Sequence, residues 1–457
     1  MSRLVVISNR VAATGQGAAG AQGGLAGALA AALKQSGGLW VGWSGEEREE
    51  ADGVPTVQEG GGLTTATIDL SPKDVRDYYN GYANSTLWPL FHFRIDLARF
   101  EHDTRRGYDR VNDLFAGAAA GMIGEGDLVW VHDYHFLPLG SSLRRRGLRN
   151  RIGFFLHIPW PPRGLLTSLP DHDLLVRSMF AYDLVGFQCD EWRNNFLEYC
   201  GTELGAVVDP VTGRVELDGE ALVAGTFPIG IDWAHFRRQG ETGEARQTEQ
   251  RMLASTRHRT AMVGVDRLDY SKGLPERMDG LARFFEQHPD RVRDLVFIQI
   301  APPSRVDIDS YRNIRDELER KTGRLNGLYS RIDMVPVRYV NQGHSAAELF
   351  GVYRAAKIGL VTPLCDGMNL VAKEYLAAQD PDDPGVLVLS QFAGAAQQLD
   401  QAVLVNPHSA DDIAAGIARA LDMPRDERQA RWQACVASVR DQDIVWWTRA
   451  FLDSLAA

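Results

Sequence analysis

The sequence predicts an α/β protein made of two domains, each built on a parallel β-sheet. Short, almost uninterrupted apolar runs such as Leu128–Asp133 and Arg151–Pro159 alternate with helical segments, a pattern typical of parallel strands covered on both faces. A second series of such strands starts at Thr260, after the polar and charged stretch 237–259. The length of 457 residues suits two domains with sizeable cores.

The composition is that of an ordinary globular chain with an acidic balance. Hydrophobic residues make up 44% and charged residues 24%, which excludes a disordered or fibrous chain. The net charge of −11 argues against general nucleic-acid binding, so any phosphate must be bound by a few placed Arg and Lys residues. The four cysteines form no C-x-x-C pair, which favours free thiols in a reducing compartment. We expect a cytoplasmic protein without a membrane-spanning segment.

The first half of the chain is expected to form a domain of residues 1–232. Its strands are predicted at Leu4–Asn9, Leu128–Asp133, Arg151–Pro159 and Leu184–Gln188. Helices are predicted from Leu25 to Lys34 and from Ser71, where Ser71 is the N-cap and proline follows at the first helical position. Residues 46–62 are acidic and glycine-rich and are expected to form a surface excursion, and Phe227–Asp232 is expected to close the domain.

The second half is expected to form a domain of residues 233–440. Its strands are predicted at 260–265, 294–300, 332–337, 358–361, 385–390 and 402–406. The charge-rich segment Tyr311–Glu319 predicts a helix with a solvent face. The C-terminal helix 441–457, which contains Trp446 and Trp447, is expected to cross back and pack on the first domain.

The stretch from Val361 to Glu374 carries the clearest chemical signal. A buried strand breaks at Asp366-Gly367 and enters a helix, so the free N–H groups and the dipole at the helix start suit a diphosphate. Asp366 could meet sugar hydroxyls, and Glu374, one turn into the helix, could meet a ribose. The stretch alone is explained equally well by an ordinary β-turn-α connection capped by Asn369, so other motifs must decide.

Two further strand ends in the second half carry candidates for phosphate binding. Arg267 and Lys272 lie on a loop that ends at a glycine, where they could neutralise charge on a diphosphate leaving group. Pairing of Arg267 with Asp269 at the surface is the alternative explanation. Arg305 follows another strand, in Ala301-Pro-Pro-Ser-Arg305.

Polar residues also end strands of the first half, at Arg10, Asp133 and His157. Open α/β sheets bind ligands at this edge, and a carboxylate and an imidazole suit sugar hydroxyls or proton transfer. A single histidine at a strand end is more often structural. In the aromatic region 78–94, core packing explains most side chains, and Tyr79 and Trp88 remain candidates for contact with a sugar face.

Several long motifs in the same order make the chain resemble the trehalose-6-phosphate synthases, which are retaining glycosyltransferases of family 20 with a GT-B fold. The resemblance covers essentially the whole chain. Its motifs are Met1–Arg10, Gly38–Gly45, Leu87–Pro89, Trp130–His135, Gly153–Pro159, Val265–Gly273, Asp366–Tyr375 and Ser390–Ala395. It implies two Rossmann-like domains whose parallel sheets face each other across a cleft, with the acceptor in the N-terminal domain and the nucleotide-sugar donor in the C-terminal domain.

The resemblance implies transfer of glucose from a nucleotide-glucose to C1 of glucose 6-phosphate, with UDP-glucose favoured as the donor and GDP-glucose, which some family members use, as the alternative. The product would be α,α-trehalose 6-phosphate, in the first step of trehalose synthesis. The implied catalytic residues are Arg267, Lys272, Asp133 and His157. The implied donor contacts are Gly24, Arg267, Lys272, Val340, Asp366, Gly367, Met368, Asn369, Leu370, Val371 and Glu374. The implied acceptor contacts are Arg10, Tyr79, Trp88, Asp133, His157 and Arg305.

The implied mechanism is attack on the face that the leaving group occupies, with the departing diphosphate taking the acceptor proton. No carboxylate is placed by sequence as a double-displacement nucleophile, so the logic of retaining glycoside hydrolases does not transfer directly. We expect no cofactor and no metal, because Arg267 and Lys272 would supply the positive charge. The expected partners are the two substrates and further copies of the chain in a dimer or tetramer, with neither nucleic acid nor membrane.

Two local departures from the family pattern concern the acceptor side and a loop. The run Pro159-Trp-Pro-Pro-Arg163-Gly164 replaces a common Phe-Pro and Pro-Glu continuation, and the loop 15–24 is unusually rich in small residues. Three alternatives remain: a pseudo-glycosyltransferase that joins cyclitols, a non-catalytic homologue that binds sugar phosphate, and a glycogen-synthase-like GT-B enzyme. The sequence leaves the donor base, the oligomeric state and regulation open.

Overall fold

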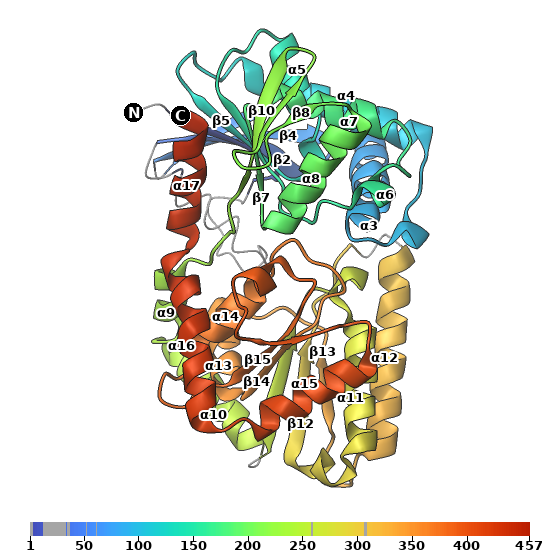
Figure 1. Cartoon of the computed structure of the whole chain (residues 1–457), viewed down its shortest axis with the longest axis vertical. Coiled ribbons are helices and arrows are strands. Elements are labelled where there is room, and N and C mark those ends of the chain that lie inside the picture. Colours follow the sequence, from blue (N-terminus) through green and yellow to red (C-terminus); the bar gives the residue numbers. More distant parts are fainter. Residues whose placement is uncertain are drawn as a thin grey trace. The chain divides into compact units, whose positions relative to one another are not determined.

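The computed structural model of this chain divides into two compact units, each of which is described by itself. The structure describes residues 3–11, 33, 37–51, 53–60, 62–256, 259–305 and 309–457. Unit 1 consists of Met1–Pro228 and Val445–Ala457, and unit 2 of Ile229–Ile444 (Figure 1). Each unit contains one sheet whose central strands are parallel, which confirms the predicted α/β class.

Unit 1 is built on a ten-stranded sheet with the order β3-β4-β2-β1-β5-β6-β7-β10-β9-β8. The parallel strands are β4 (Leu63–Leu70), β2 (Leu39–Glu47), β1 (Leu4–Arg10), β5 (Leu128–His132), β6 (Ile152–Phe155), β7 (Leu184–Phe187) and β10 (Glu220–Thr226). The antiparallel edge strands are β3 (Thr56–Gly60), β9 (Arg214–Leu217) and β8 (Val207–Val208). The central strands are buried because their apolar runs are covered on both faces.

Three parts of unit 1 differ from the prediction or lie outside the described residues. The predicted excursion 46–62 contains strand β3, whose residues are all exposed, so its polar sequence does not distinguish it from a loop. The strands β8, β9 and β10 were not predicted, and Phe227–Asp232 follows β10 as irregular chain. The predicted helix from Leu25 to Lys34 lies outside the described residues except for the helical, buried Leu33.

The helix predicted from Ser71 begins as expected and then widens into a π-helix. The side chain of Ser71 accepts a hydrogen bond from the Asp74 N–H, and Pro72 opens α2 (Pro72–Asp74). The chain continues as the π-helix η1 (Val75–Leu87) of 13 residues and then as α3 (Trp88–Phe91). Long π-helices are rare and frequently lie at functional sites, and this one carries Tyr79.

The remaining helices of unit 1 cover the sheet, and the last of them comes from the C-terminal end of the chain. They are η2 (Ile95–Leu97), α4 (His102–Ala120), η3 (Tyr134–Phe136), α5 (Leu139–Arg145), α6 (Arg163–Leu166), α7 (His172–Ser178), η4 (Met179–Ala181), α8 (Asp190–Glu203) and α17 (Ile444–Ala456). On α17 the buried Phe451 stacks on Trp130 with ring centroids 4.5 Å apart. Gly153 and Gly186 leave room for this ring, since a Cβ on either would lie within 2.8 Å of it.

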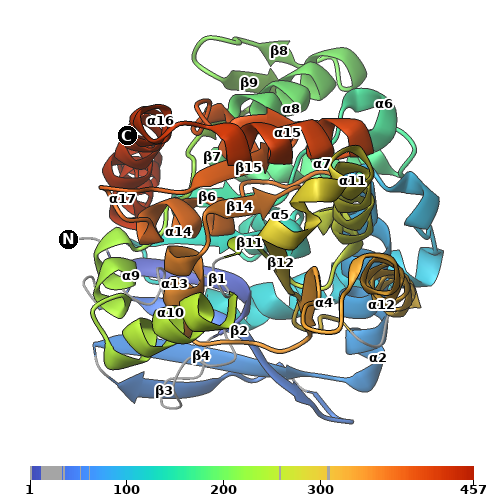
Figure 2. The ribbon, with the colours of Figure 1, turned by 90° about the horizontal axis from the view of Figure 1, so that it is seen from below.

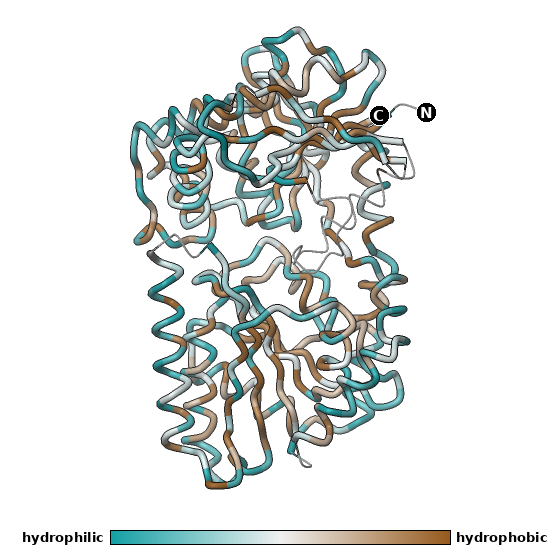
Figure 3. The backbone as a smooth tube through the Cα atoms, turned by 180° about the vertical axis from the view of Figure 1, so that it is seen from behind, coloured by the Kyte–Doolittle hydropathy of each residue, from teal (hydrophilic) through white to brown (hydrophobic). Residues whose placement is uncertain are grey.

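Unit 2 is built on a six-stranded, fully parallel sheet in the order β13-β12-β11-β14-β15-β16. Its strands are β11 (Thr260–Val265), β12 (Leu295–Ile300), β13 (Val337–Val340), β14 (Ile358–Val361), β15 (Val386–Ser390) and β16 (Val403–Val405). They form the hydrophobic centre of the unit, brown in Figure 3. The strand predicted at 332–337 is wrong: it begins only at Val337, because Pro336 has no N–H for the sheet and Ile332 is fully exposed.

The helices of unit 2 form two groups that cover the sheet. They are α9 (Trp233–Gln239), α10 (Gly243–Thr256), η5 (Tyr270–Lys272), α11 (Leu274–Gln287), η6 (Pro289–Asp294), α12 (Asp309–Tyr329), α13 (Ala346–Ala355), α14 (Leu370–Ala378), η7 (Gly394–Gln397), α15 (Ala410–Asp422) and α16 (Arg425–Asp441). Helix α11 packs on α12 and α15, whereas α13 packs on α9, α10 and α14, as Figure 2 shows for α11 with α15 and for α10 with α13. None of the helices that the structure describes is both long and apolar enough to cross a membrane.

Candidate functional site

In unit 2, the loop after β11 holds Lys272 at the carboxyl edge of the sheet. Asp269 opens the turn by accepting a hydrogen bond from the Ser271 N–H at 2.9 Å. The turn ends at Gly273, whose φ of 63° is left-handed and whose Cβ, if present, would lie 2.4 Å from the Thr362 carbonyl oxygen. Only glycine fits this close approach, so the backbone itself fixes the position of Lys272 beside the end of β14.

The predicted donor residues Lys272 and Asp366 meet in this unit. The Lys272 ammonium lies 2.6 Å from the Asp366 carboxylate, and both side chains are 12% exposed. Asn369 also donates to Asp366, at 3.1 Å. The loop before α14 and the loop after β11 therefore converge on one charged pair, as expected for residues at neighbouring strand ends of a parallel sheet.

Arg267 is half-buried, and it makes neither a hydrogen bond nor an ion pair with any residue that the structure describes. Its predicted alternative, pairing with Asp269, is wrong. Asp269 is instead 3.7 Å from Arg305 and accepts a hydrogen bond from Tyr311 at 3.1 Å. A half-buried guanidinium that pairs with no described carboxylate suits an anionic ligand.

The start of α14 combines a side-chain cap with open backbone donors. Asn369, with a φ of 102°, is the N-cap and accepts a hydrogen bond from the Ala372 N–H at 3.1 Å. The N–H groups of Leu370 and Val371 have no hydrogen-bond acceptor among the described residues. The predicted cap and the predicted anion-binding helix start are therefore compatible rather than exclusive.

The remaining predicted donor residues surround this helix start. Gly367 and Met368 are buried in the loop, where the Gly367 carbonyl approaches so closely that a Cβ on Gly394 would lie 2.0 Å from it. Glu374 accepts a hydrogen bond from Tyr353 at 3.4 Å, and burial raises the pKa of the Glu374 carboxyl to about 7. Val340 is half-buried at the end of β13, and Gly24 lies outside the described residues.

A buried polar network beneath this loop was not predicted. Arg277 of α11 is fully buried and donates to Asp266 at 2.8 Å, to Gln299 at 2.8 Å and to Thr362 at 3.0 Å. It therefore links the ends of β11, β12 and β14, and burial raises the pKa of the Asp266 carboxyl. The one signal for it in the sequence is Gln299, a polar residue inside an otherwise apolar strand.

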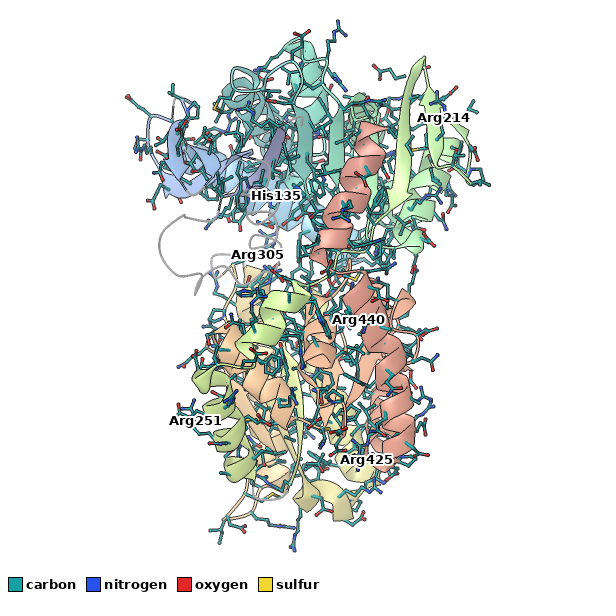
Figure 4. The ribbon with its side chains drawn as sticks, turned by 90° about the vertical axis from the view of Figure 1, so that its left-hand side faces the viewer. His135, Arg214, Arg251, Arg305, Arg425 and Arg440 are labelled. Carbon is teal, nitrogen blue, oxygen red and sulfur yellow. The ribbon has the colours of Figure 1, made fainter. Side chains whose placement is uncertain are left out.

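In unit 1, Arg10 at the end of β1 joins an aromatic cluster. Its exposed guanidinium lies 4.4 Å from the ring centroid of Trp43 and 5.9 Å from that of Tyr79. Tyr79 stacks on His135 with centroids 6.0 Å apart and planes within 11° (Figure 4 labels His135). Trp43 and His135 were missed, because their approach depends on β2 and the loop after β5 lying beside η1. Arg305 belongs to unit 2, so the predicted acceptor set is divided between the units.

Asp133 and His157 lie next to each other at the ends of β5 and β6. Asp133 has a φ of 75°, a strained conformation for a residue other than glycine, and its carboxylate accepts a hydrogen bond from the His157 backbone N–H at 3.2 Å. The imidazole of His157 lies 3.1 Å from the ring of His132 and 3.3 Å from the Gln188 amide. Burial lowers the pKa of His157 to about 3 and that of His132 well below its usual range, so both rings are neutral.

Trp88 is 5% exposed, and its ring packs against His92 and Tyr134 with centroids 4.2 Å and 5.5 Å away. It is mainly a core residue, and its contact with a sugar stays a prediction.

Of the departures from the family pattern, Trp160 is buried in the core and Arg163 forms a surface ion pair with Glu203 at 2.5 Å. Among the described residues, no group of three or more His, Cys, Asp or Glu side chains is arranged to hold a metal ion.

Comparison with known proteins gives matches along the whole chain. The pattern of Glycosyltransferase family 20 matches residues 3–457. A trehalose-6-phosphate synthase of Sinorhizobium fredii is 44% identical, with 100% of this chain and 99% of that protein covered. A UDP-forming α,α-trehalose-phosphate synthase of Burkholderia xenovorans, solved in complex with glucose-6-phosphate, has a TM-score of 0.94 at 42% identity and 100% coverage of both chains. The Escherichia coli protein bound with UDP-2-fluoro glucose has a TM-score of 0.94 at 41% identity, with 99% of each chain covered.

Proposed function

We propose, from the premise that this chain belongs to glycosyltransferase family 20, that it transfers glucose from UDP-glucose to glucose 6-phosphate and releases α,α-trehalose 6-phosphate and UDP. The full-length similarity to a UDP-forming synthase solved with glucose-6-phosphate supports both the reaction and the donor base. The observation that carries the proposal is the meeting of Lys272 with Asp366 at the strand ends of unit 2, on the loop that also carries Arg267, which pairs with no described residue.

Unit 2 is the proposed donor domain. Arg267 and Lys272 hold the diphosphate, which replaces Asp366 as the counter-ion of the ammonium group. Asp366, which keeps its hydrogen bond from Asn369, then accepts hydrogen bonds from the hydroxyls of the transferred glucose. The open N–H groups of Leu370 and Val371 add donors for phosphate oxygens at the helix start. The other proposed donor contacts are Gly24, Val340, Gly367, Met368, Asn369 and, for the ribose, Glu374.

Unit 1 supplies most of the proposed acceptor contacts. Arg10 is exposed and lies over two aromatic rings, which leaves its guanidinium edge available for the phosphate of glucose 6-phosphate. Tyr79 and Trp88 are proposed to contact the sugar, and Asp133 and His157 its hydroxyl groups. Arg305 of unit 2 is the second proposed phosphate contact. Because the pKa of His157 is about 3, its ring acts as a neutral hydrogen-bonding group and not as an acid at neutral pH.

The proposed chemistry retains configuration at the donor carbon. The bond from glucose C1 to the diphosphate oxygen breaks, and a bond from C1 to the O1 oxygen of glucose 6-phosphate forms on the same face. The proton of the attacking hydroxyl passes to the departing diphosphate. Arg267 and Lys272 stabilise the negative charge that grows on that diphosphate, which is the largest contribution we assign to protein groups. We propose that no metal or cofactor takes part.

The test of the leaving-group role compares Arg267→Ala and Lys272→Ala with Arg283→Ala. Arg283 is a matched control because it lies on α11, is exposed and pairs with Asp411. We expect turnover of each site variant to fall by about 10²–10³, the effect of removing one preorganised donor to a developing charge. The melting temperature of Arg267→Ala should stay near that of the control, whereas Lys272→Ala should also lose some stability because Asp366 loses its ion pair. UDP release is measured in a coupled assay, and near-wild-type turnover of both site variants would refute the role.

A donor panel decides the substrate. UDP-, GDP- and ADP-glucose are each supplied with glucose 6-phosphate, and the products are identified by mass spectrometry. We expect trehalose 6-phosphate from UDP-glucose at the highest rate. Activity with free glucose would indicate a glycogen-synthase-like enzyme, and a product from a cyclitol donor alone would indicate a pseudo-glycosyltransferase.

We also propose a cytoplasmic location and a homo-oligomeric assembly. The four cysteines are buried and free, which fits a reducing compartment. The oligomer rests on the family resemblance alone and is measured by light scattering coupled to gel filtration, where a monomer at micromolar concentration would contradict it.

A further inference from the structure

Lys373 is a buried lysine that the proposed mechanism does not use. It follows the N-cap of α14 by one turn, and its side chain is fully buried. Its ammonium donates to the Ile229 carbonyl oxygen and to the Gln398 side-chain oxygen, both at 2.6 Å. No described carboxylate lies within ion-pair distance of it, and burial lowers the pKa of Lys373 to about 7. An amine buried without a counter-charge is costly, so its two acceptors indicate what it does there.

Both acceptors lead to the places where the chain enters and leaves unit 2. Ile229 is the first residue of the unit, and Ile444 is the last. Gln398 donates in turn to the side chain of Gln442, which lies two residues before the exit. Residues 229–231 lie where the chain enters unit 2, and residues 442–444 lie where it leaves. We call both of them exit segments, because each leads out of the unit.

The exit segments are also bound directly to each other. The Ile444 N–H donates to the Ile231 carbonyl at 3.1 Å. Gly230 lies so close to the other segment that a Cβ on it would be 2.2 Å from the Gln442 carbonyl oxygen. The two exit segments are therefore held together by a backbone hydrogen bond and by a close backbone contact. In Figure 4, Arg440 marks the end of α16 from which this exit continues, and within unit 2 it lies at the same end as Arg305, opposite Arg425.

The same short helix carries the proposed donor residues. Asn369 caps α14 and bonds to Asp366, and Glu374, the neighbour of Lys373, faces Tyr353 instead of the exits. A helix of nine residues moves as one body, so a shift at its first turn reaches the Lys373 ammonium. The chain thus offers a continuous path from Asp366 through α14 and Lys373 to both exit segments.

We propose that Lys373 is a positioning residue that couples the donor-binding end of α14 to both exit segments of unit 2. Occupation of the donor site reorders the first turn of α14, and Lys373 with Gln398 and Gln442 transmits that change to the backbone at 229–231 and 442–444. Lys373 touches no substrate in this scheme. The inference rests on the proposed donor site and adds the route by which donor binding is communicated.

Hydrogen–deuterium exchange of the full chain tests the coupling, with UDP as the probe. We expect UDP to slow exchange in the first turn of α14 and in both exit segments, by about 5- to 150-fold, the usual range of coupling between sites. In Gln442→Leu, UDP should still protect α14 but leave the exit segments unchanged. Gln429→Leu is the control, because Gln429 is a glutamine of α16 whose side chain donates, among the described residues, to the carbonyls of Pro381 and Asp382 and not to the exit segments. It should behave as the wild type.

Kinetics separate positioning from a purely structural role. Lys373→Met and Gln442→Leu should both lower kcat for the transfer while the UDP affinity stays within about twofold, since a group that transmits a change need not hold the ligand. A lysine that merely satisfies a carbonyl would lower the melting temperature and leave kcat and the exit protection intact. If Lys373→Met does not fold, Gln442→Leu and Gln398→Leu carry the same test.

Two outcomes would overturn the inference in different ways. Wild-type protection of the exit segments by UDP in Gln442→Leu would show that the network does not carry the coupling, and the donor site would stand. Absence of UDP protection at α14 in the wild type would remove the proposed donor site, and the coupling would fall with it.

Discussion

Replacing Arg277 with methionine removes the centre of the buried polar network that links the ends of β11, β12 and β14. Methionine fills much of the same space but takes away the donors to Asp266, Gln299 and Thr362. The Asp266 carboxylate is then left with 2% side-chain exposure and without its counter-ion. Because the Arg277 guanidinium also reaches the Lys272 carbonyl at 3.4 Å, the loop that carries Lys272 loses a support as well.

The expected loss of stability follows from the burial of this pair. Removing one partner of a buried ion pair costs about 3–5 kcal/mol, because a buried charge is left uncompensated. For a unit the size of residues 229–444, this corresponds to a fall in its melting temperature of roughly 6–20 °C. The double variant Arg277→Met with Asp266→Leu should recover most of the loss, since it removes both charges together.

The loss should also depend on pH in a defined direction. Burial already raises the pKa of Asp266 above that of an unfolded chain, and removal of Arg277 raises it further. A raised carboxyl pKa favours the folded state at low pH and costs stability as the pH rises through the folded value. The difference in unfolding free energy between Arg277→Met and the wild type should therefore shrink as the pH is lowered towards the pKa that Asp266 has in the folded variant.

Differential scanning calorimetry of the full chain between pH 5 and pH 8 is the assay, with Arg283→Met as the matched surface control. Arg283 pairs with Asp411 in an exposed position, so its loss should cost about 1 kcal/mol or less. The reasoning would be refuted if Arg277→Met behaved like Arg283→Met at pH 7.5, or if its loss of stability were the same at every pH.

Two further predictions concern Glu374 and Trp447. Burial raises the pKa of the Glu374 carboxyl from 4.5 to about 7, so the ionised side chain costs stability as the pH rises through this range. Glu374→Gln should therefore be more stable than the wild type by up to about 3 kcal/mol at pH 8, and equally stable near pH 4.5. Urea unfolding at both pH values measures this, and an equal difference at both would contradict it. Trp447 is fully buried with its ring centroid 4.8 Å from that of Trp130, so Trp447→Ala should cost about 3–5 kcal/mol in the calorimetric transition of unit 1, with Trp446→Ala as the neighbouring comparison. A loss below about 1 kcal/mol would show that α17 contributes little to that unit.

The sequence allowed prediction of features that depend on local pattern. The strand before Arg267 and the turn at Asp366-Gly367 were placed correctly, because an apolar run or a glycine turn can be recognised from a few consecutive residues. From these positions the meeting of Lys272 with Asp366 follows, since parallel strands end at one edge of the sheet.

Features that depend on distant partners were not predictable in the same way. Strand β3 was predicted as part of a loop because its residues are exposed and its sequence shows no buried face, and the π-helix η1 was predicted as an α-helix because it follows the Ser71 cap and Pro72 that typically open an α-helix. The stack of Arg10, Trp43, Tyr79 and His135 requires four separate segments to be placed in space. The pairing of Arg305 rather than Arg267 with Asp269 was likewise decided by side-chain packing around Tyr311.

The ion pair between Lys272 and Asp366 has a consequence for the release of product. In the proposed roles, a nucleotide-glucose separates the pair and satisfies both members, one with its diphosphate and the other with its sugar hydroxyls. In these roles, the sugar leaves with the acceptor after transfer, and the Asp366 carboxylate loses its contacts with the sugar hydroxyls while it lies beside a nucleoside diphosphate of like charge. The return of Asp366 to Lys272, at 2.6 Å, then competes directly with the retained diphosphate. In the proposed roles, Asp366 thus competes with the diphosphate for Lys272, and this competition favours release of the nucleoside diphosphate over release of an intact donor.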